Sequence, residues 1–144
     1  MMEKSLTLRQ RVAICFAAGV VGALAVLLFG RVLFELGLSA TFGVKAPISL
    51  HPPDIYRPLF WGGLWGIPFG FFINTALKRL YLFGLLYFLA PLLALYTIFL
   101  PMSGAGYFGL QQGGPMFALY LLLLNLPYGI ITALAARAII GKKP

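Results

Sequence analysis

Four long runs of apolar residues, separated by short polar or turn-forming segments, dominate the pattern of the chain. They cover residues of about 12–38, 58–77, 80–100 and 116–140. A helix needs roughly 20 mainly apolar residues to cross the hydrocarbon core of a bilayer, and each run meets that length. Glycine, proline and serine, which form turns, are frequent between the first two and the last two runs. The pattern predicts an all-α integral membrane protein whose single domain has four transmembrane helices.

Composition supports a membrane location and limits the chemistry of the chain. Hydrophobic residues make up 61% of the 144 residues and charged residues 10%, against about 25% charged in soluble domains. The first run is too long for the apolar part of a secretory signal, so we expect it to stay as a span. One cysteine, one histidine and three carboxylates, far apart in the sequence, form no group of metal ligands. We therefore expect no cofactor and a protein that is not an enzyme.

Most lysines and arginines lie on one side of the predicted membrane. Three precede the first helix, two separate the second and third helices, and three stand near the C-terminus, which accounts for eight of the eleven. Cytoplasmic segments carry an excess of these residues, so we expect both termini in the cytoplasm, as in a protein of the bacterial inner (plasma) membrane. The net charge of +8 then reflects topology and attraction to anionic lipids rather than binding to nucleic acid.

Small residues mark a packing face on the second predicted helix. Gly62, Gly66 and Gly70 recur every four residues, a spacing that lets a neighbouring backbone approach closely. The first predicted helix carries two matching pairs of small residues, Ala18 with Gly22 and Gly19 with Ala23. We expect the first and second helices to pack on each other through these positions. The alternative is a face for self-association of the chain.

Prolines and a few polar side chains fall within the predicted spans. Pro68, Pro91 and Pro127 lie near the middle of the second, third and fourth helices. Each removes a backbone donor, which predicts either a plain kink or a broken helix of the kind that lines a site in transporters. The polar side chains that could line a pathway or form a network between helices are Asn125, Tyr128, Thr132, Asn74 and Thr75.

Charged residues near the predicted outer surface form two groups. Arg31 and Glu35 are four residues apart on one helix face, so they predict an ion pair. This pair either braces the outer end of the first helix or is a functional pair within the span. The loop before the second helix holds His51, Asp54 and Arg57. We expect Asp54 and Arg57 to cap and orient the start of that helix; alternatively, the loop contacts a partner.

A short pattern recurs in the second and fourth predicted helices. Pro68-Phe-Gly70 matches Pro127-Tyr-Gly129, and Thr75-Ala-Leu77 matches Thr132-Ala-Leu134. The match leaves open an ancient parallel duplication of a two-helix hairpin.

Two functions are compatible with these features. The first is a non-enzymatic accessory or assembly subunit of a membrane complex, or a small homo-oligomer, with lipid and other membrane subunits as partners. The alternative is a channel or small-solute transporter whose pathway runs beside the proline-kinked second and fourth helices.

Overall fold

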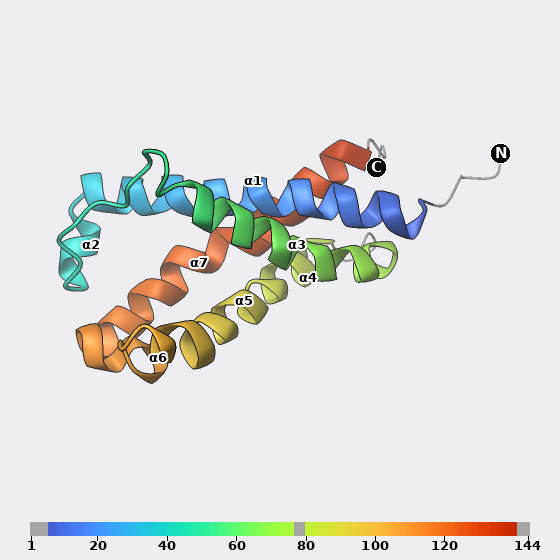
Figure 1. Cartoon of the computed structure of the whole chain (residues 1–144). Coiled ribbons are helices and arrows are strands. Elements are labelled where there is room, and N and C mark those ends of the chain that lie inside the picture. The colour runs from blue at the N-terminus through green and yellow to red at the C-terminus, as the bar shows by residue number, and fades with distance from the viewer. Residues whose placement is uncertain (1–5, 77–79, 141–144) are drawn as a thin grey trace.

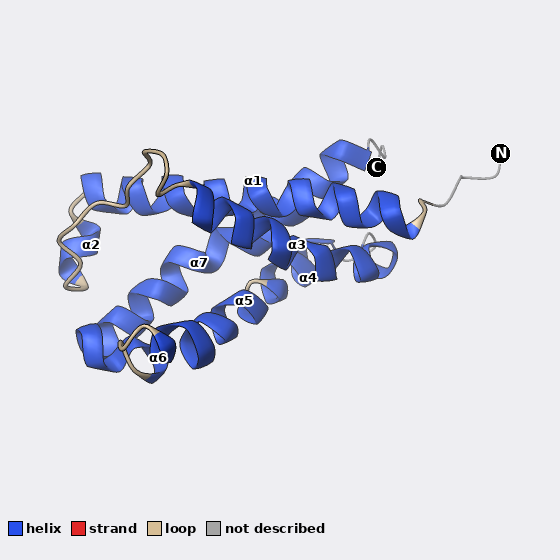
Figure 2. Ribbon diagram, in the orientation of Figure 1, coloured by secondary structure: helices blue, strands red, loops and turns tan. Residues whose placement is uncertain are grey.

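The computed structural model describes the backbone of residues 6–76 and 80–140, with all side chains in these ranges except those of residues 72–76, 80, 81 and 83. The described ranges contain helices and connecting turns and no strand (Figure 2). In chain order the elements are α1 (Leu8–Glu35), α2 (Leu38–Thr41), α3 (Tyr56–Ala76), α4 (Leu80–Tyr87), α5 (Leu89–Ala94), a π-helical segment (Leu95–Phe99), α6 (Leu100–Met102), a 3-10 turn (Tyr107–Gly109) and α7 (Leu110–Ile140).

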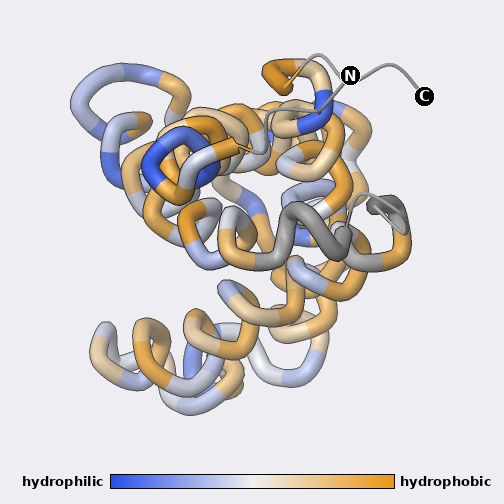
Figure 3. The backbone as a smooth tube through the Cα atoms, turned by 90° about the vertical axis from the view of Figure 1, so that its right-hand side faces the viewer, coloured by the Kyte–Doolittle hydropathy of each residue, from blue (hydrophilic) through white to orange (hydrophobic). Residues whose placement is uncertain are grey.

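Three helical segments are long and apolar enough to cross a membrane. They are Leu8–Glu35, Gly84–Met102 and Tyr107–Ile140 in the described part of the chain. The helix between the first two, α3, has 21 residues. The expectation of an all-helical chain with membrane-length helices is confirmed. Apolar residues occur along all the long helices (Figure 3). Many large apolar side chains remain exposed, as suits contact with lipid.

The first helix begins and ends earlier than its apolar run. Thr7 and Gln10 form a capping box, in which the Thr7 hydroxyl accepts from the Gln10 backbone N–H at 3.3 Å and the Gln10 side chain accepts from the Thr7 N–H at 2.9 Å. Gly37 takes a left-handed conformation with φ 74°, which stops α1 although the apolar run continues to residue 38. The capping box and Gly37 thus set the ends of α1, and hydropathy alone does not predict these ends.

The three prolines near the middle of the apolar runs differ in their effect. The helices α3 and α7 continue through Pro68 and Pro127. The third apolar run is instead divided, because α4 ends before Phe88, α5 contains Pro91, and a π-helical segment follows. A second interruption occurs at Gly114, with φ 67°, so α7 bends where the fourth run was expected to begin. Gly84–Met102 still forms one helical segment of membrane length, so the third predicted helix is present but irregular in its hydrogen bonding at Phe88 and over Leu95–Phe99.

Helices α1 and α3 pack backbone on backbone through glycines. A Cβ atom added at Gly19 would collide with the carbonyl oxygen of Gly62 and lie 3.0 Å from the Cα of Gly66. The Gly62 position likewise meets Ala23. The pair that faces α3 is thus Gly19 with Ala23. Gly22 faces α7 instead, where an added Cβ would collide with Thr132, which corrects the expectation that it packs on the second predicted helix.

Buried small residues also join α7 to the other helices. Ala18 is fully buried in a cluster with Phe69 of α3 and with Ala133 and Ala136 of α7. A second glycine crossing joins α4 to α7, because an added Cβ at Gly129 would collide with the carbonyl oxygen of Gly84. The short pattern shared by the second and fourth apolar runs pairs Gly70 with Gly129. Gly70 packs on α1, where an added Cβ would lie 3.1 Å from the Arg11 carbonyl oxygen, as expected for the glycine face. The duplication itself stays a prediction.

The helices form a bundle with two distinct ends (Figure 1). The start of α1, the end of α3, the start of α4 and the end of α7 lie at one end, which we call the terminal end. The segments α2 and α6 lie at the other, the loop end. Toward the loop end α5, α6 and the first half of α7 diverge from α1 and α3 (Figures 1 and 3). We call these diverging segments the arm.

Substitution of Gly66 tests the packing of α1 on α3. An added methyl group would collide with the backbone carbonyl of Cys15, which no side-chain rotation can relieve. Gly66→Ala should lower the free energy of unfolding by about 1–3 kcal/mol, measured by denaturant titration in mixed micelles. Gly70→Ala is the milder comparison and should lower stability less, because its added methyl would crowd the Arg11 carbonyl oxygen at 3.1 Å without a full collision. Equal stability of the two variants would contradict the backbone contact.

Candidate functional site

A cavity of about 380 Å³ lies between α1, α3, the π-helical segment and α7. Its walls are mostly apolar, and its size falls in the range of roughly 300–1,000 Å³ that is common for small-molecule sites. Both tryptophans of the chain, Trp61 and Trp65, line it. The polar side chains in its walls belong to Arg57, Asn125 and Tyr128. These three residues define the candidate site.

The divergence of the arm and one aromatic contact shape this cavity. Glycine packing holds α3 on α1, whereas the pieces that follow α4 move away from both helices (Figure 1). Pro91, which lacks a backbone N–H, lies in the wall formed by this broken helix. The ring of Trp61 meets Phe99 edge to face with centroids 5.2 Å apart, which links α3 to the π-helical segment. Trp61 of α3 and Phe99 of the π-helical segment therefore form adjoining parts of the cavity wall.

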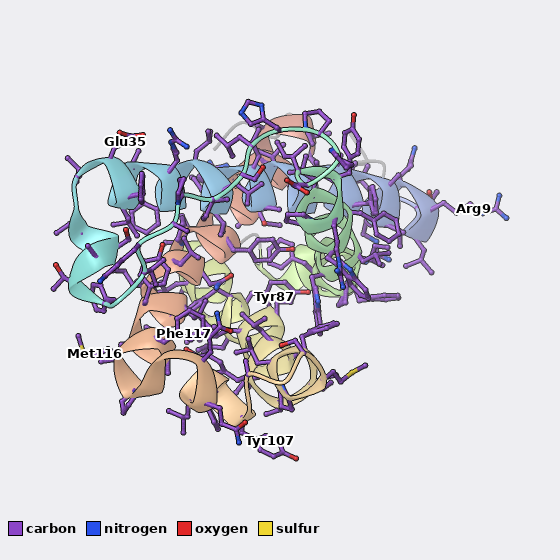
Figure 4. All side chains as sticks on the ribbon, turned by 60° about the vertical axis from the view of Figure 1, so that its left-hand side comes forward. Arg9, Glu35, Tyr87, Tyr107, Met116 and Phe117 are labelled. Carbon is purple, nitrogen blue, oxygen red and sulfur yellow. The ribbon has the colours of Figure 1, made fainter. Side chains whose placement is uncertain are left out.

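Three tyrosines tie neighbouring helices together through backbone carbonyls. Tyr128 in α7 donates its hydroxyl to the Gly62 carbonyl oxygen of α3 at 2.6 Å, and this bond is buried. Tyr87 in α4 donates to the Trp65 carbonyl of α3, and Tyr96 donates to the Ala118 carbonyl of α7. Figure 4 shows Tyr87 among the helices in the middle of the molecule. A buried phenol needs such a partner, because lipid offers none.

The predicted polar residues of the spans do not form one network. Asn125 lines the cavity but donates to the Leu121 carbonyl of its own helix at 2.8 Å, rather than to another helix. Tyr128 lines the cavity and binds α3. Thr132 is fully buried against Gly22 and does not line the cavity. The side chains of Asn74 and Thr75 lie outside the described residues.

The predicted pair at the end of α1 is an ion pair on the surface. An Arg31 guanidinium nitrogen lies 2.8 Å from a Glu35 carboxylate oxygen, and the two side chains are 42% and 60% exposed. Arg31 also lies over the ring of Phe34, 5.8 Å from its centroid. Glu35 and Arg9 project from opposite ends of α1 (Figure 4). An exposed pair of this kind contributes little to stability.

The loop before α3 separates the three residues that the sequence grouped. Asp54 accepts a hydrogen bond from the Ser49 hydroxyl at 2.9 Å, and the His51 backbone N–H donates to the same hydroxyl at 3.4 Å. Arg57 stands apart from this turn, in the wall of the cavity. Asp54 therefore organises the loop, whereas Arg57 belongs to the cavity. Among the described residues no three His, Cys, Asp or Glu side chains are placed to hold a metal ion.

Sequence reasoning missed Tyr87 and Tyr96 as ties between helices. Their signal was available, because a tyrosine in the middle of an apolar run must find an acceptor for its hydroxyl. It also missed the cavity wall in which Trp61 and Trp65 of α3 come together with Pro91 of α5. Neither spacing nor hydropathy relates residues so far apart in the chain.

Removal of the Tyr128 hydroxyl tests the tie between α7 and α3. Tyr128→Phe keeps the ring and loses the bond to the Gly62 carbonyl, so the free energy of unfolding should fall by about 0.6–2 kcal/mol. Denaturant titration in mixed micelles measures the change. Tyr56→Phe is the control, since Tyr56 is 61% exposed at the start of α3. Unchanged stability of the Tyr128 variant would show that the buried bond contributes nothing.

Comparison with known proteins adds no relative from which a role could be carried over. The chain matches no family model, no curated protein and no solved structure.

Proposed function

We propose that this chain is a non-enzymatic protein of the plasma membrane that crosses the membrane four times. In this proposal α3 crosses the membrane in addition to the three long apolar helices, and both termini lie in the cytoplasm. Support comes from the terminal end of the bundle, where the start of α1 and the end of α7 lie together (Figure 1). Arg9, Arg11 and Arg137 belong to these helix ends, and basic residues favour the cytoplasmic side. The 21 residues of α3 correspond to about 30 Å of helix, enough for a span.

Its function in the proposal is association within the membrane, as an accessory or assembly subunit of a complex or as a small homo-oligomer. The observation that carries this proposal is the apolar tip of the arm. Five large side chains there are each at least 42% exposed, and we call them the arm tip: Met102, Tyr107, Phe108, Leu110 and Met116. Methionine and aromatic side chains are common anchors at protein interfaces.

The backbone of the arm tip supports a role beyond simple exposure to lipid. Phe108 has φ 58°, the one non-glycine residue with positive φ in the described ranges. A bulky residue seldom adopts this left-handed conformation, and such strain is concentrated at functional sites. The ring of Phe108 packs on Tyr96 with centroids 4.9 Å apart, which holds the strained turn against the π-helical segment. The arm tip is thus an apolar surface with an ordered backbone, which suits contact with a membrane-protein partner.

Polar substitution of the arm tip tests association. Native mass spectrometry of the chain released from membranes should find it with a second copy or another subunit. The double variant Met102→Ser and Tyr107→Ser should weaken this assembly roughly tenfold, because truncation of an interface anchor costs about 1–2 kcal/mol. Leu8→Ser with Ile139→Ser, two exposed apolar positions at the terminal end, is the control. A monomeric wild-type chain, or unchanged assembly of the arm-tip variant, would contradict the proposal.

Transport of a small solute is the second candidate, favoured by a specific observation. Asn125 and Tyr128 line the same cavity as Arg57, beside the broken helix that contains Pro91. Polar groups beside interrupted helices are found at the sites of transporters. The cavity then serves as part of a pathway.

Solute flux distinguishes transport from association. Liposomes that contain the purified chain should release encapsulated ions or small polar solutes if the second candidate is correct, and Asn125→Ala should abolish that release. Thr97→Val is the control, because Thr97 is exposed and bonds only the Leu93 carbonyl of its own helix. Flux that survives in Asn125→Ala would remove this residue from the pathway, and absence of flux in the wild-type chain would exclude the candidate.

A further inference from the structure

The cavity carries a positive charge that the proposed association does not use. Arg57 is an exposed residue in the first turn of α3, and it lines the cavity. In the described part of the chain, no carboxylate lies within salt-bridge distance of Arg57. Asp54, three residues earlier, accepts from Ser49 and does not line the cavity. The guanidinium is thus available to an anionic oxygen from outside the chain, for which its fork of donors is well suited.

A second polar side chain lies in the same wall with hydrogen-bonding capacity left over. Asn125 uses one amide N–H for the Leu121 carbonyl, which leaves its other N–H and its carbonyl oxygen. The bond from Tyr128 to the Gly62 carbonyl fixes the register of α7 against α3. Asn125 comes almost one turn before Tyr128 on α7, on the side of the loop end. It therefore stands toward the first turns of α3, where Arg57 begins the cavity wall.

The remaining walls suit a hydrocarbon chain. They are formed mainly by aliphatic and aromatic side chains, and Trp61 stays 40% exposed, so the cavity is open rather than sealed. Lipid tails are as apolar as leucine, so such walls admit a tail without selecting it. Selection must come from the charged and polar groups. An occupant with an apolar tail and an anionic head satisfies both parts of the cavity.

We infer that this cavity binds one acyl chain of an anionic phospholipid, with the phosphate of its headgroup at the Arg57 guanidinium and its tail along Trp61 and Trp65. Asn125 offers a hydrogen bond to the polar groups between head and tail. The inference needs the membrane location of the chain but neither association nor transport. If association or transport is disproved, the lipid site is unaffected. If the lipid site is disproved, association and transport are unaffected.

Intrinsic fluorescence gives a direct measurement, because both tryptophans of the chain line the cavity. The full chain is placed in phosphatidylcholine vesicles that contain a small, equal fraction of either phosphatidylglycerol or phosphatidylcholine with brominated acyl chains, which quench tryptophan. Brominated phosphatidylglycerol should occupy the site more strongly, on the order of fivefold, the scale set by one basic side chain beside an anionic headgroup. Equal quenching by the two brominated lipids would overturn the inference.

Charge variants assign the preference to Arg57. Arg57→Gln should bring the preference for the anionic lipid close to one, and Arg57→Lys should retain most of it because the charge remains. Arg31→Gln is the matched control, since this arginine lies near the loop end of α1 and is paired with Glu35. If Arg57→Gln keeps the full preference, or Arg31→Gln loses it equally, the lipid is attracted by the general charge of the protein and not by this cavity. The tryptophan emission in unbrominated vesicles checks that each variant is folded.

Discussion

The contact between the backbones of α1 and α3 is the constraint on which the rest of the structure depends. Gly19, Gly62 and Gly66 have no side chains, so the two helices approach until backbone atoms meet. In a bilayer the hydrophobic effect does not hold helices together, and close packing of this kind takes its place. The contact fixes α3, and α3 supplies the Gly62 carbonyl that the Tyr128 hydroxyl of α7 requires. The position of α7 depends on this bond together with the direct packing of α7 on α1 at Gly22 and Ala18.

Polar groups within the spans serve mainly to join helices. The hydroxyl groups of Tyr87, Tyr96 and Tyr128 each find a backbone carbonyl on a neighbouring helix, because a hydroxyl without a partner is costly in hydrocarbon. Arg57 and Asn125 differ, since both line the cavity and keep unused donors. This contrast between satisfied and available polar groups is the physical basis for placing a ligand in the cavity.

Breaks in the third apolar run create both surfaces to which we assign function. The irregularities at Phe88 and over Leu95–Phe99 lie in the helix that diverges from α1 and α3, and the strained turn at Phe108 lies where the arm reverses into α7. On its inner side the arm leaves the cavity, and at its end it exposes the arm tip. Irregular backbone within membrane depth is tolerated where protein or a cavity surrounds it.

The sequence by itself determined that the chain is helical and suited to a membrane, that α3 carries a glycine face, and that Arg31 and Glu35 pair, because hydropathy and spacing along one helix are local properties. Tertiary structure decided that Gly19 rather than Gly22 meets α3, that Asn125 bonds its own helix, and that Arg57 joins the cavity instead of Asp54. These outcomes depend on which faces of separate helices meet and where a helix breaks. Contacts between residues far apart in the chain determine these outcomes, so no local sequence pattern predicts them.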